Sequence, residues 1–399
     1  MMAHHEVVVV GGGSAGLAVA AQLLNQKHAP EVAIIDPSEK HYYQPIWTLV
    51  GGGVFPKEIS ERDQKDYIPL GATWIKDKVA SFDPDHNSIQ LAGGDSVTYD
   101  YLVVAAGIQI NWGAIPGLKE SVGKPGTGVC SNYSYDTVGS TWDNIKAIKS
   151  GTALFTQPNT PIKCGGAPQK IMYLACNHFE REGIRPNVDV KFMSAAGGIF
   201  AVPKYAAALN KVVANYGIET HYGHDLVEIR ADKKEADFVK LATGEKMTMK
   251  YDMIHVTPPQ GPPDFIKNSP LAAETGWVNV DKHTTQHVKY PNVFSLGDCS
   301  SLPTSKTGAA IRKQAPTTTA NIMSMIAGRP LSASYDGYTS CPLVTGYGKL
   351  ILAEFSGYTN EPEESFPFNQ AEERYSMYAL KAYGLPRMYW HGMLKGREF

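Results

Sequence analysis

Residues 7–16, VVVVGGGSAG, constrain the fold of this chain more than any other segment. Four valines run directly into three glycines, and this order predicts a buried strand, a tight turn and the start of a helix. Gly11, Gly13 and Gly16 stand in the G-x-G-x-x-G register of a Rossmann nucleotide site. The first glycine turns the chain, the second admits a pyrophosphate against bare backbone, and the third lets helix and strand pack closely.

The residues after the glycines predict a complete β-α-β unit. Amides at the helix start, those of Ser14 and Ala15 among them, are expected to hold the phosphate. An apolar helical pattern follows, and then a second buried strand over residues 32–35 leads to Asp36. That acid lies 20 positions beyond Gly16, where a ribose hydroxyl needs an acceptor. A glycine-rich turn in an ordinary α/β core is the alternative, and the β-α-β context favours the nucleotide site.

Composition limits the classes of protein that fit. The 399 residues, 43% of them hydrophobic and 19% charged, suit a globular enzyme of two or three domains. A net charge of −2 argues against a nucleic-acid partner. Five cysteines without a C-x-x-C pair indicate neither a secreted disulfide framework nor a zinc site, so we expect no metal. The triple glycine argues against a membrane span or signal peptide near the start, and a strand from about residue 7 leaves no room for a transit peptide.

Two later segments are expected to line a flavin. The aromatic segment 41–47, which contains Gln44, precedes three more glycines and is predicted to form a wall of the site. A buried strand over residues 100–107 ends in small residues, as in flavoproteins with two dinucleotide-binding domains. Ala106 and Gly107 would there let the backbone approach the cofactor.

A third segment, residues 292–298, returns the chain to the same domain as a strand that ends in Gly297 and Asp298. In flavoproteins with two dinucleotide-binding domains this aspartate binds the ribityl chain. The next helix, here from about Thr307, points its amino end at the isoalloxazine.

Between these segments the sequence predicts a second α/β domain. Strands are expected at 152–156, 188–193, 218–222, 226–229 and 252–256, and helices at 168–180 and 204–216. The fold class is therefore α/β, with two Rossmann-like domains and a C-terminal membrane-associating segment. The predicted boundaries are 1–115 with 290–335 for an FAD-binding domain, 116–289 for the second domain and 336–399 for the C-terminal segment.

The tail, residues 372–399, interleaves tyrosine, tryptophan and methionine with basic residues, and Pro386 divides it into two short helical pieces. This composition suits a membrane interface. A terminal helix that caps the core or contacts another subunit fits equally well, because no face of the tail is wholly apolar.

The cysteines differ in their surroundings. Cys164 stands at a strand end before a helix, and the helix dipole and the adjacent Lys163 would both lower its pKa from about 8.5. A reactive thiol and a small buried hydrophobe are both compatible with that position. Cys341 stands in a polar segment before Pro342, where we expect a turn rather than a packing site. Packing is expected for Cys176 and Cys299, and Cys130 is undecided.

Five segments resemble the sulfide:quinone oxidoreductases, and more closely the type II group that includes the mitochondrial enzymes. The resemblance runs nearly end to end, and its specific segments are 42–51 (YYQPIWTLVG), 158–174 (PNTPIKCGGAPQKIMYL), 255–263 (HVTPPQGPP), 297–306 (GDCSSLPTSK) and 335–355 (YDGYTSCPLVTGYGKLILAEF). It implies FAD as cofactor, with Cys164 and Cys341 as the redox pair on its re face.

The resemblance also implies a mechanism. Hydrosulfide attacks the bridged pair at Cys341, leaves a persulfide there and frees Cys164, which adds to flavin C4a and departs from reduced FAD. Two electrons pass to a membrane quinone, ubiquinone or menaquinone, and an acceptor removes the sulfur: sulfite, glutathione, coenzyme A or sulfide itself. Lys306 would stabilise negative charge on reduced flavin, or be a solvated loop lysine. Peripheral attachment to a bacterial cell membrane or the mitochondrial inner membrane follows, with a homo-oligomer as a further expectation.

Two departures from the type II pattern leave the sulfur product and the depth of membrane attachment open. Cys130 supplies a third cysteine, a feature of the polysulfide-forming type I enzymes, and the tail is shorter than in the mitochondrial enzymes.

Three alternative functions remain. A type II NADH dehydrogenase would need a nucleotide loop where residues 164–168 stand, and a flavocytochrome c sulfide dehydrogenase subunit should carry an export signal. A flavin-stabilised membrane scaffold would bind the cofactor but catalyse no reaction.

Overall fold

The larger sheet is organised around β1 (Met2–Val10) in the computed structural model, which describes residues 2–398. Val7, Val8 and Val9 have no exposed surface, as expected for a parallel strand covered on both faces. The sheet order is β5 (Thr73–Ile75), β2 (Val32–Ile35), β1, β8 (Ser96–Val104), β7 (Ser88–Leu91) and β6 (Val79–Asp83), and β19 (Val293–Ser295) pairs in parallel with β8.

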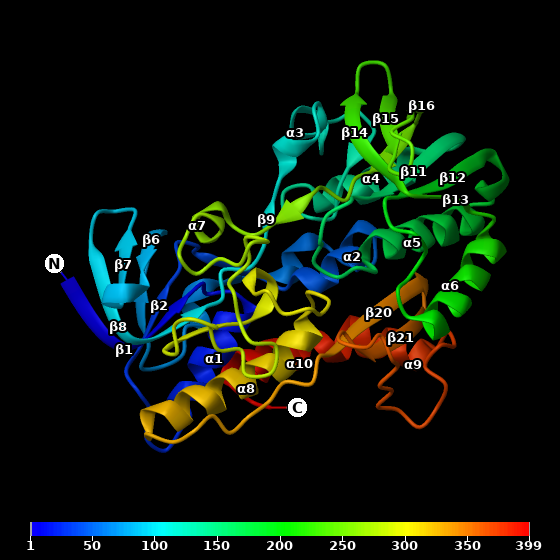
Figure 1. Ribbon diagram of the computed structural model, residues 1–399. Coiled ribbons are helices and arrows are strands. Elements are labelled where there is room, and N and C mark those ends of the chain that lie inside the picture. The colour runs from blue at the N-terminus through cyan, green and yellow to red at the C-terminus, as the bar shows by residue number, and fades with distance from the viewer. Residues whose placement is uncertain (1, 399) are drawn as a thin grey trace.

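Two helices lie side by side under this sheet, α1 (Ser14–Leu24) and α8 (Gly308–Ile326) (Figure 1). The Thr319 hydroxyl of α8 donates to the Gln22 side chain of α1 across 2.9 Å. α1 follows β1, and α8 follows β19 after a loop, so both helices begin at the carboxyl edge of parallel strands. Open α/β sheets bind their ligands at that edge.

The second sheet has five parallel strands in the order β10 (Val129–Cys130), β17 (Met253–His255), β11 (Gly151–Gln157), β12 (Val188–Ser194) and β13 (Glu219–Tyr222). Its helices are α4 (Val138–Ala147), α5 (Ala167–Arg181) and α6 (Pro203–Tyr216). The predicted strand at 226–229 falls outside this sheet: β14 (His224–Arg230) pairs with β15 (Glu235–Lys240), and β15 with β16 (Lys246–Lys250), as an antiparallel sheet.

Short elements connect these layers. They are β3 (Lys40–Tyr42) with β4 (Glu61–Asp63), β9 (Gln109–Ile110) with β18 (Gln260–Gly261), α2 (Trp47–Gly51), α3 (Leu118–Ser121) and α7 (Asp264–Lys267).

The C-terminal segment begins with an antiparallel ribbon, β20 (Tyr338–Gly346) and β21 (Lys349–Ser356). The helical tail follows: α9 (Tyr375–Ala379), a wider π turn over Leu380–Gly384, and α10 (Leu385–His391). Pro386 is the second residue of α10 and follows the π turn directly, so the wider turn accommodates its ring and its missing N–H. The predicted break is therefore a local widening, and the chain stays helical across it.

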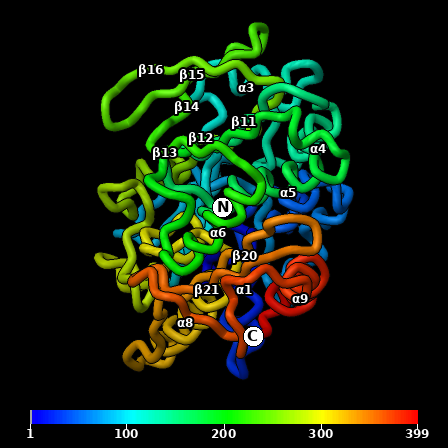
Figure 2. Tube along the Cα trace, turned by 90° about the vertical axis from the view of Figure 1, so that its right-hand side faces the viewer, coloured from blue at the N-terminus to red at the C-terminus, as the bar shows by residue number. Residues whose placement is uncertain are grey.

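The tail packs against the first domain. Met377, Trp390 and Leu394 are at most 7% exposed. The Asn25 side chain, at the end of α1, donates to the Lys395 carbonyl at 3.0 Å, and Figure 2 shows the C-terminal end of the chain beside α1. Of the two interpretations of the tail, the cap on the core is what these contacts show. No helix within residues 2–398 has the length and apolar character to cross a membrane.

Candidate active site

The three loop glycines serve different physical needs. A Cβ on Gly11, which has φ +106°, would lie 2.5 Å from the Ala105 carbonyl oxygen. A Cβ on Gly16 would lie 1.8 Å from the Gly11 carbonyl oxygen, whereas a Cβ on Gly13 would meet no atom within 4 Å. The chain itself therefore requires the first and third glycines. The second faces open space in front of the α1 amides, the arrangement that a bound diphosphate needs.

Asp36 lies across this loop. Its Oδ2 accepts a hydrogen bond from the Gly12 amide at 2.6 Å, and its Oδ1 accepts one from the Ser38 amide at 2.7 Å. The carboxylate is half-buried at the carboxyl end of β2. It is thus held beside the glycines as an acceptor, as the sequence places it.

The other predicted cofactor residues lie on three segments. Ala106 and Gly107 follow β8, and Gly107 has φ +74° with open space where a Cβ would stand. Gln44, in contrast, uses its side-chain oxygen to accept a hydrogen bond from the Lys163 ammonium at 2.5 Å. Gln44 therefore connects the aromatic segment to the segment that carries Cys164.

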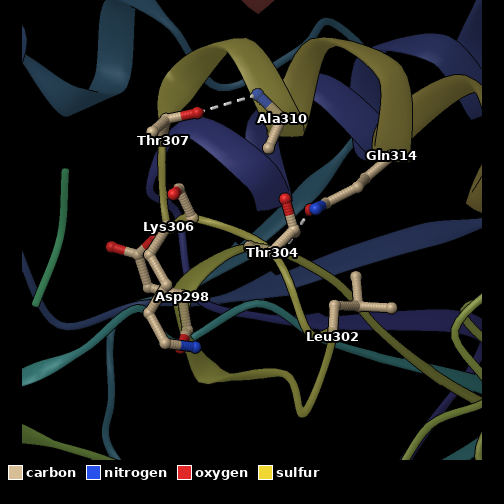
Figure 3. A pocket seen from close by; sticks show the side chains of 9 residues that line it. Asp298, Leu302, Thr304, Lys306, Thr307, Ala310 and Gln314 are labelled. Atoms are coloured by element: carbon tan, nitrogen blue, oxygen red, sulfur yellow. Dashed lines mark hydrogen bonds between the residues drawn. The ribbon is translucent and has the colours of Figure 1, made fainter. Parts of the chain in front are cut away.

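A small pocket at the start of α8 contains the remaining predicted residues (Figure 3). The Gly297 amide donates to the Gln314 side chain at 2.9 Å, and the Thr307 hydroxyl caps α8 by accepting from the Ala310 amide at 3.1 Å. Asp298 lines the same pocket, and burial raises the pKa of its carboxyl.

Lys306 is tied down in this pocket. Its ammonium donates to the carbonyls of Asp298 at 2.6 Å and Ser300 at 3.1 Å, and it lies 3.8 Å from the centre of the Trp277 ring. Burial lowers the pKa of this ammonium. It is therefore not a solvated loop lysine, although its hydrogen-bond partners are backbone carbonyls.

Cys164 and Cys341 are 177 positions apart in sequence, and their sulfurs lie 3.2 Å apart. Cys164 precedes α5 in a left-handed conformation with φ +58°, and its amide donates to the Lys306 carbonyl at 2.8 Å. This last contact joins the cysteine segment to the pocket at the start of α8.

The expectation that Cys341 stands in a turn is wrong. It lies in the middle of β20, opposite Ala353 of β21, and is 2% exposed. Pro342 favours a turn in the sequence because proline usually interrupts strands. It is tolerated here because β20 pairs on one side only, and an edge strand has no ladder partner to lose on its other side.

The cation beside Cys164 is Lys170, so the assignment to Lys163 is wrong. The Lys170 ammonium lies 3.1 Å from the Cys164 sulfur, whereas Lys163 points to Gln44. A hydrogen bond from Cys341 and the Lys170 charge hold the pKa of the Cys164 thiol well below its usual range. The neighbouring thiolate and burial raise the pKa of Cys341.

A second buried lysine, Lys381, enters the same site from the tail. Its ammonium donates to the Pro45 carbonyl at 2.9 Å, and burial together with the Lys170 charge lowers its pKa to about 7. Sequence reasoning missed both lysines. Lys170 follows Cys164 by six positions on the first turns of the predicted helix, a signal that was available. Lys381 gave none, because the tail reaches this site only through tertiary packing.

The other three cysteines are fully buried. Burial raises the pKa of Cys130 and Cys176 to about 12 and also raises that of Cys299. The Cys130 thiol donates to the Ile254 carbonyl at 3.5 Å within the second sheet. These thiols are protonated at neutral pH and have the surroundings of packing residues.

The chain is similar to known proteins over nearly its whole length. The model of the pyridine nucleotide-disulphide oxidoreductase family matches residues 5–137 and 187–323. The mitochondrial sulfide:quinone oxidoreductase of Dictyostelium discoideum is 53% identical over 99% of this chain and 87% of its own length, and that of Mus musculus is 48% identical over 98% and 87%.

A solved structure agrees with this fold. The sulfide:quinone oxidoreductase of Aquifex aeolicus superposes with a TM-score of 0.81 at 17% identity, over 99% of this chain and 92% of that one. The two-domain α/β architecture predicted from the sequence is therefore confirmed. With relatives this similar over nearly the whole chain, the protein belongs to the sulfide:quinone oxidoreductase family.

Proposed function

We propose that this protein oxidises hydrogen sulfide through Cys164 and Cys341 and passes two electrons, by way of bound FAD, to a membrane quinone. One observation carries the proposal: two cysteines from distant segments place their sulfurs 3.2 Å apart beside a buried ammonium. The family supports the same reaction, because its members are named for sulfide and quinone.

The residues fit FAD. The open space at Gly13, the α1 amides and the Asp36 carboxylate suit the diphosphate and ribose, and the residues at the start of α8, Asp298 among them, suit the flavin end. We assign this role to the domain formed by residues 1–115 and 290–335, beside a second domain at 116–289. Bound FAD would accept two electrons from sulfide oxidation and release them to the quinone.

The chemistry of this chain's own residues begins with the oxidised pair, in which the two sulfurs are bonded. Hydrosulfide attacks the Cys341 sulfur, the new S–S bond leaves a persulfide on Cys341, and the old bond breaks with its electron pair going to Cys164. A thiolate of low pKa is the better leaving group. The Lys170 ammonium, 3.1 Å from Cys164, stabilises that thiolate as it forms.

A nucleophilic acceptor then removes the outer sulfur from Cys341 and leaves the Cys341 thiolate. Sulfite, glutathione, coenzyme A and sulfide all have the required nucleophilic atom. The Cys164 and Cys341 thiolates re-form their S–S bond by giving up two electrons, which bound FAD would accept. The pKa of Cys164 is lowered and that of Cys341 is raised. Cys164 is therefore the better stabilised thiolate and the leaving group, and Cys341 is the sulfur that hydrosulfide attacks.

We propose that the protein attaches peripherally to a membrane through side chains of the tail that are not buried in the core. Tyr375 and Tyr383 of the tail are 68% and 53% exposed, and Tyr383 contacts Phe55 edge to face at 5.8 Å. Exposed aromatic side chains of this kind suit the membrane interface. Tyr383→Asp should weaken co-sedimentation with lipid vesicles and leave sulfide oxidation in solution unchanged.

Anaerobic mixing of the purified protein with sulfide, and separately with NADH, tests the proposal. Sulfide should bleach the flavin absorbance within seconds, and NADH should not, because residues 164–168 stand where a second nucleotide loop would be. Quinone reduction should then depend on sulfide and respond to the choice of sulfite, glutathione, coenzyme A or cyanide as acceptor. Rapid bleaching by NADH would move the protein to the NADH dehydrogenase class.

A further inference from the structure

The tail reaches the glycine-rich loop through a buried tyrosine. The Tyr389 hydroxyl lies 2.7 Å from the Ser14 hydroxyl and 2.5 Å from His41 Nε2. Tyr389 and His41 are 6% and 4% exposed. On its other side, His41 Nδ1 lies 3.0 Å from the Gln64 side-chain oxygen and 3.2 Å from the Gly12 carbonyl oxygen.

The partners fix the direction of each hydrogen bond. The Gln64 amide nitrogen donates to the Gly12 carbonyl at 2.7 Å, so the Gln64 oxygen faces His41. Nδ1 therefore carries the proton, because both its neighbours are acceptors, and Nε2 of the neutral ring accepts from Tyr389. Since Tyr389 has only one proton, Ser14 donates to Tyr389.

These hydrogen bonds form a closed circuit. It begins at Ser14 of the glycine-rich loop and ends at the Gly12 carbonyl of the same loop. Ser14 donates to Tyr389, Tyr389 to His41, His41 to Gln64, and Gln64 to Gly12. Its two ends flank Gly13, the position that faces open space.

Aromatic packing holds the centre of the circuit in place. Tyr389 lies 4.6 Å from the Tyr43 ring, and the neighbouring Trp390 lies 4.8 Å from Tyr67 and 5.5 Å from His41. The Lys395 carbonyl is bound by Asn25 at the opposite end of α1. The tail thus forms hydrogen bonds with both ends of α1.

We propose that Tyr389 is a positioning residue for the flavin site, acting through Ser14, His41 and Gln64 to hold the glycine-rich loop in the shape that binds the FAD diphosphate. This inference rests on the proposed FAD site and adds that the tail controls how firmly the cofactor is held. The Ser14 proton is committed to Tyr389, so the backbone amides are left to contact the phosphate.

Flavin release from the full-length holoprotein tests this role. Free flavin fluorescence after dilution should appear about tenfold faster from Tyr389→Phe than from the wild type, a change of about 1.4 kcal/mol. Tyr375→Phe, which removes a hydroxyl from the exposed part of the same tail, should release flavin at the wild-type rate. A wild-type rate for Tyr389→Phe would overturn the proposal.

Two further variants separate positioning from a general loss of stability. Gln64→Met breaks the other end of the circuit without touching the tail, and it should speed release by a similar factor. Ser14→Ala combined with Tyr389→Phe should release flavin no faster than Tyr389→Phe alone, because both changes break one circuit. A wild-type rate for Gln64→Met, or a double variant in which the two effects multiply, would overturn the positioning role. Absence of flavin from the purified wild type would instead refute the proposed function.

Discussion

Replacing Lys170 by methionine should make Cys164 a poorer thiolate. Methionine is unbranched and only one atom shorter, so the apolar stem is largely kept, while the ammonium 3.1 Å from the Cys164 sulfur is lost. A hydrogen bond to a charged group contributes about 1.5–3 kcal/mol. At a fixed pH within the titration range, the ratio of thiolate to thiol should therefore fall by about tenfold to a hundredfold.

The assay is alkylation of the reduced protein by iodoacetamide between pH 5 and 9, with the modified cysteine located by mass spectrometry. Only the thiolate reacts, so the rate follows its fraction. The low pKa of Cys164 should keep the wild-type rate high at neutral pH, and the rate should fall as the pH drops through that pKa. In Lys170→Met the same fall should occur at higher pH.

Lys163→Met is the matched control, because that ammonium contacts Gln44 instead of a sulfur. Its alkylation profile should follow the wild type. If Lys163→Met shifts the profile and Lys170→Met does not, the assignment of the thiolate's partner is wrong.

Three other changes test separate parts of the structure. Gly13→Val should fold but lose flavin, measured as the ratio of flavin to protein, because a Cβ there meets only the open space left for the phosphate; full occupancy would contradict this. Cys176→Ser should keep its activity but lose about 1–3 kcal/mol of unfolding free energy in urea, because a hydroxyl is buried in an apolar core. Lys381 has its pKa lowered from 10.5 to about 7, so between these values the unfolded chain binds more protons and stability rises with pH. Lys381→Met should remove this contribution, so wild type and variant should unfold with different pH slopes from pH 7 to 10.

Much of the fold was predictable because it depends on local sequence patterns. The strand-glycine-helix order at residues 7–16 and the Gly297-Asp298 ending determine where β1, α1, β19 and α8 lie. The helix at 168–180 and its preceding strand were also placed within a few residues, since their apolar periodicity is strong.

Features that depend on tertiary packing were harder to predict from the sequence. Cys341 was assigned to a turn because the unpaired edge of β20 is invisible in the sequence. Lys163 is adjacent to Cys164 in sequence and is for that reason expected to lower its pKa, but the ammonium that lies near the sulfur in space is that of Lys170. The contact of Tyr389 with Ser14 joins residues 375 positions apart, and no local pattern predicts it.

The flavin absorbance after rapid mixing with sulfide, in wild type, Cys164→Ser, Cys341→Ser and the double variant, tests the central claim most directly. Because the two sulfurs share one reaction, each single variant should abolish bleaching and the double variant should be scarcely worse than either. A Cys341→Ser protein whose flavin is still reduced by sulfide at the wild-type rate would contradict the account.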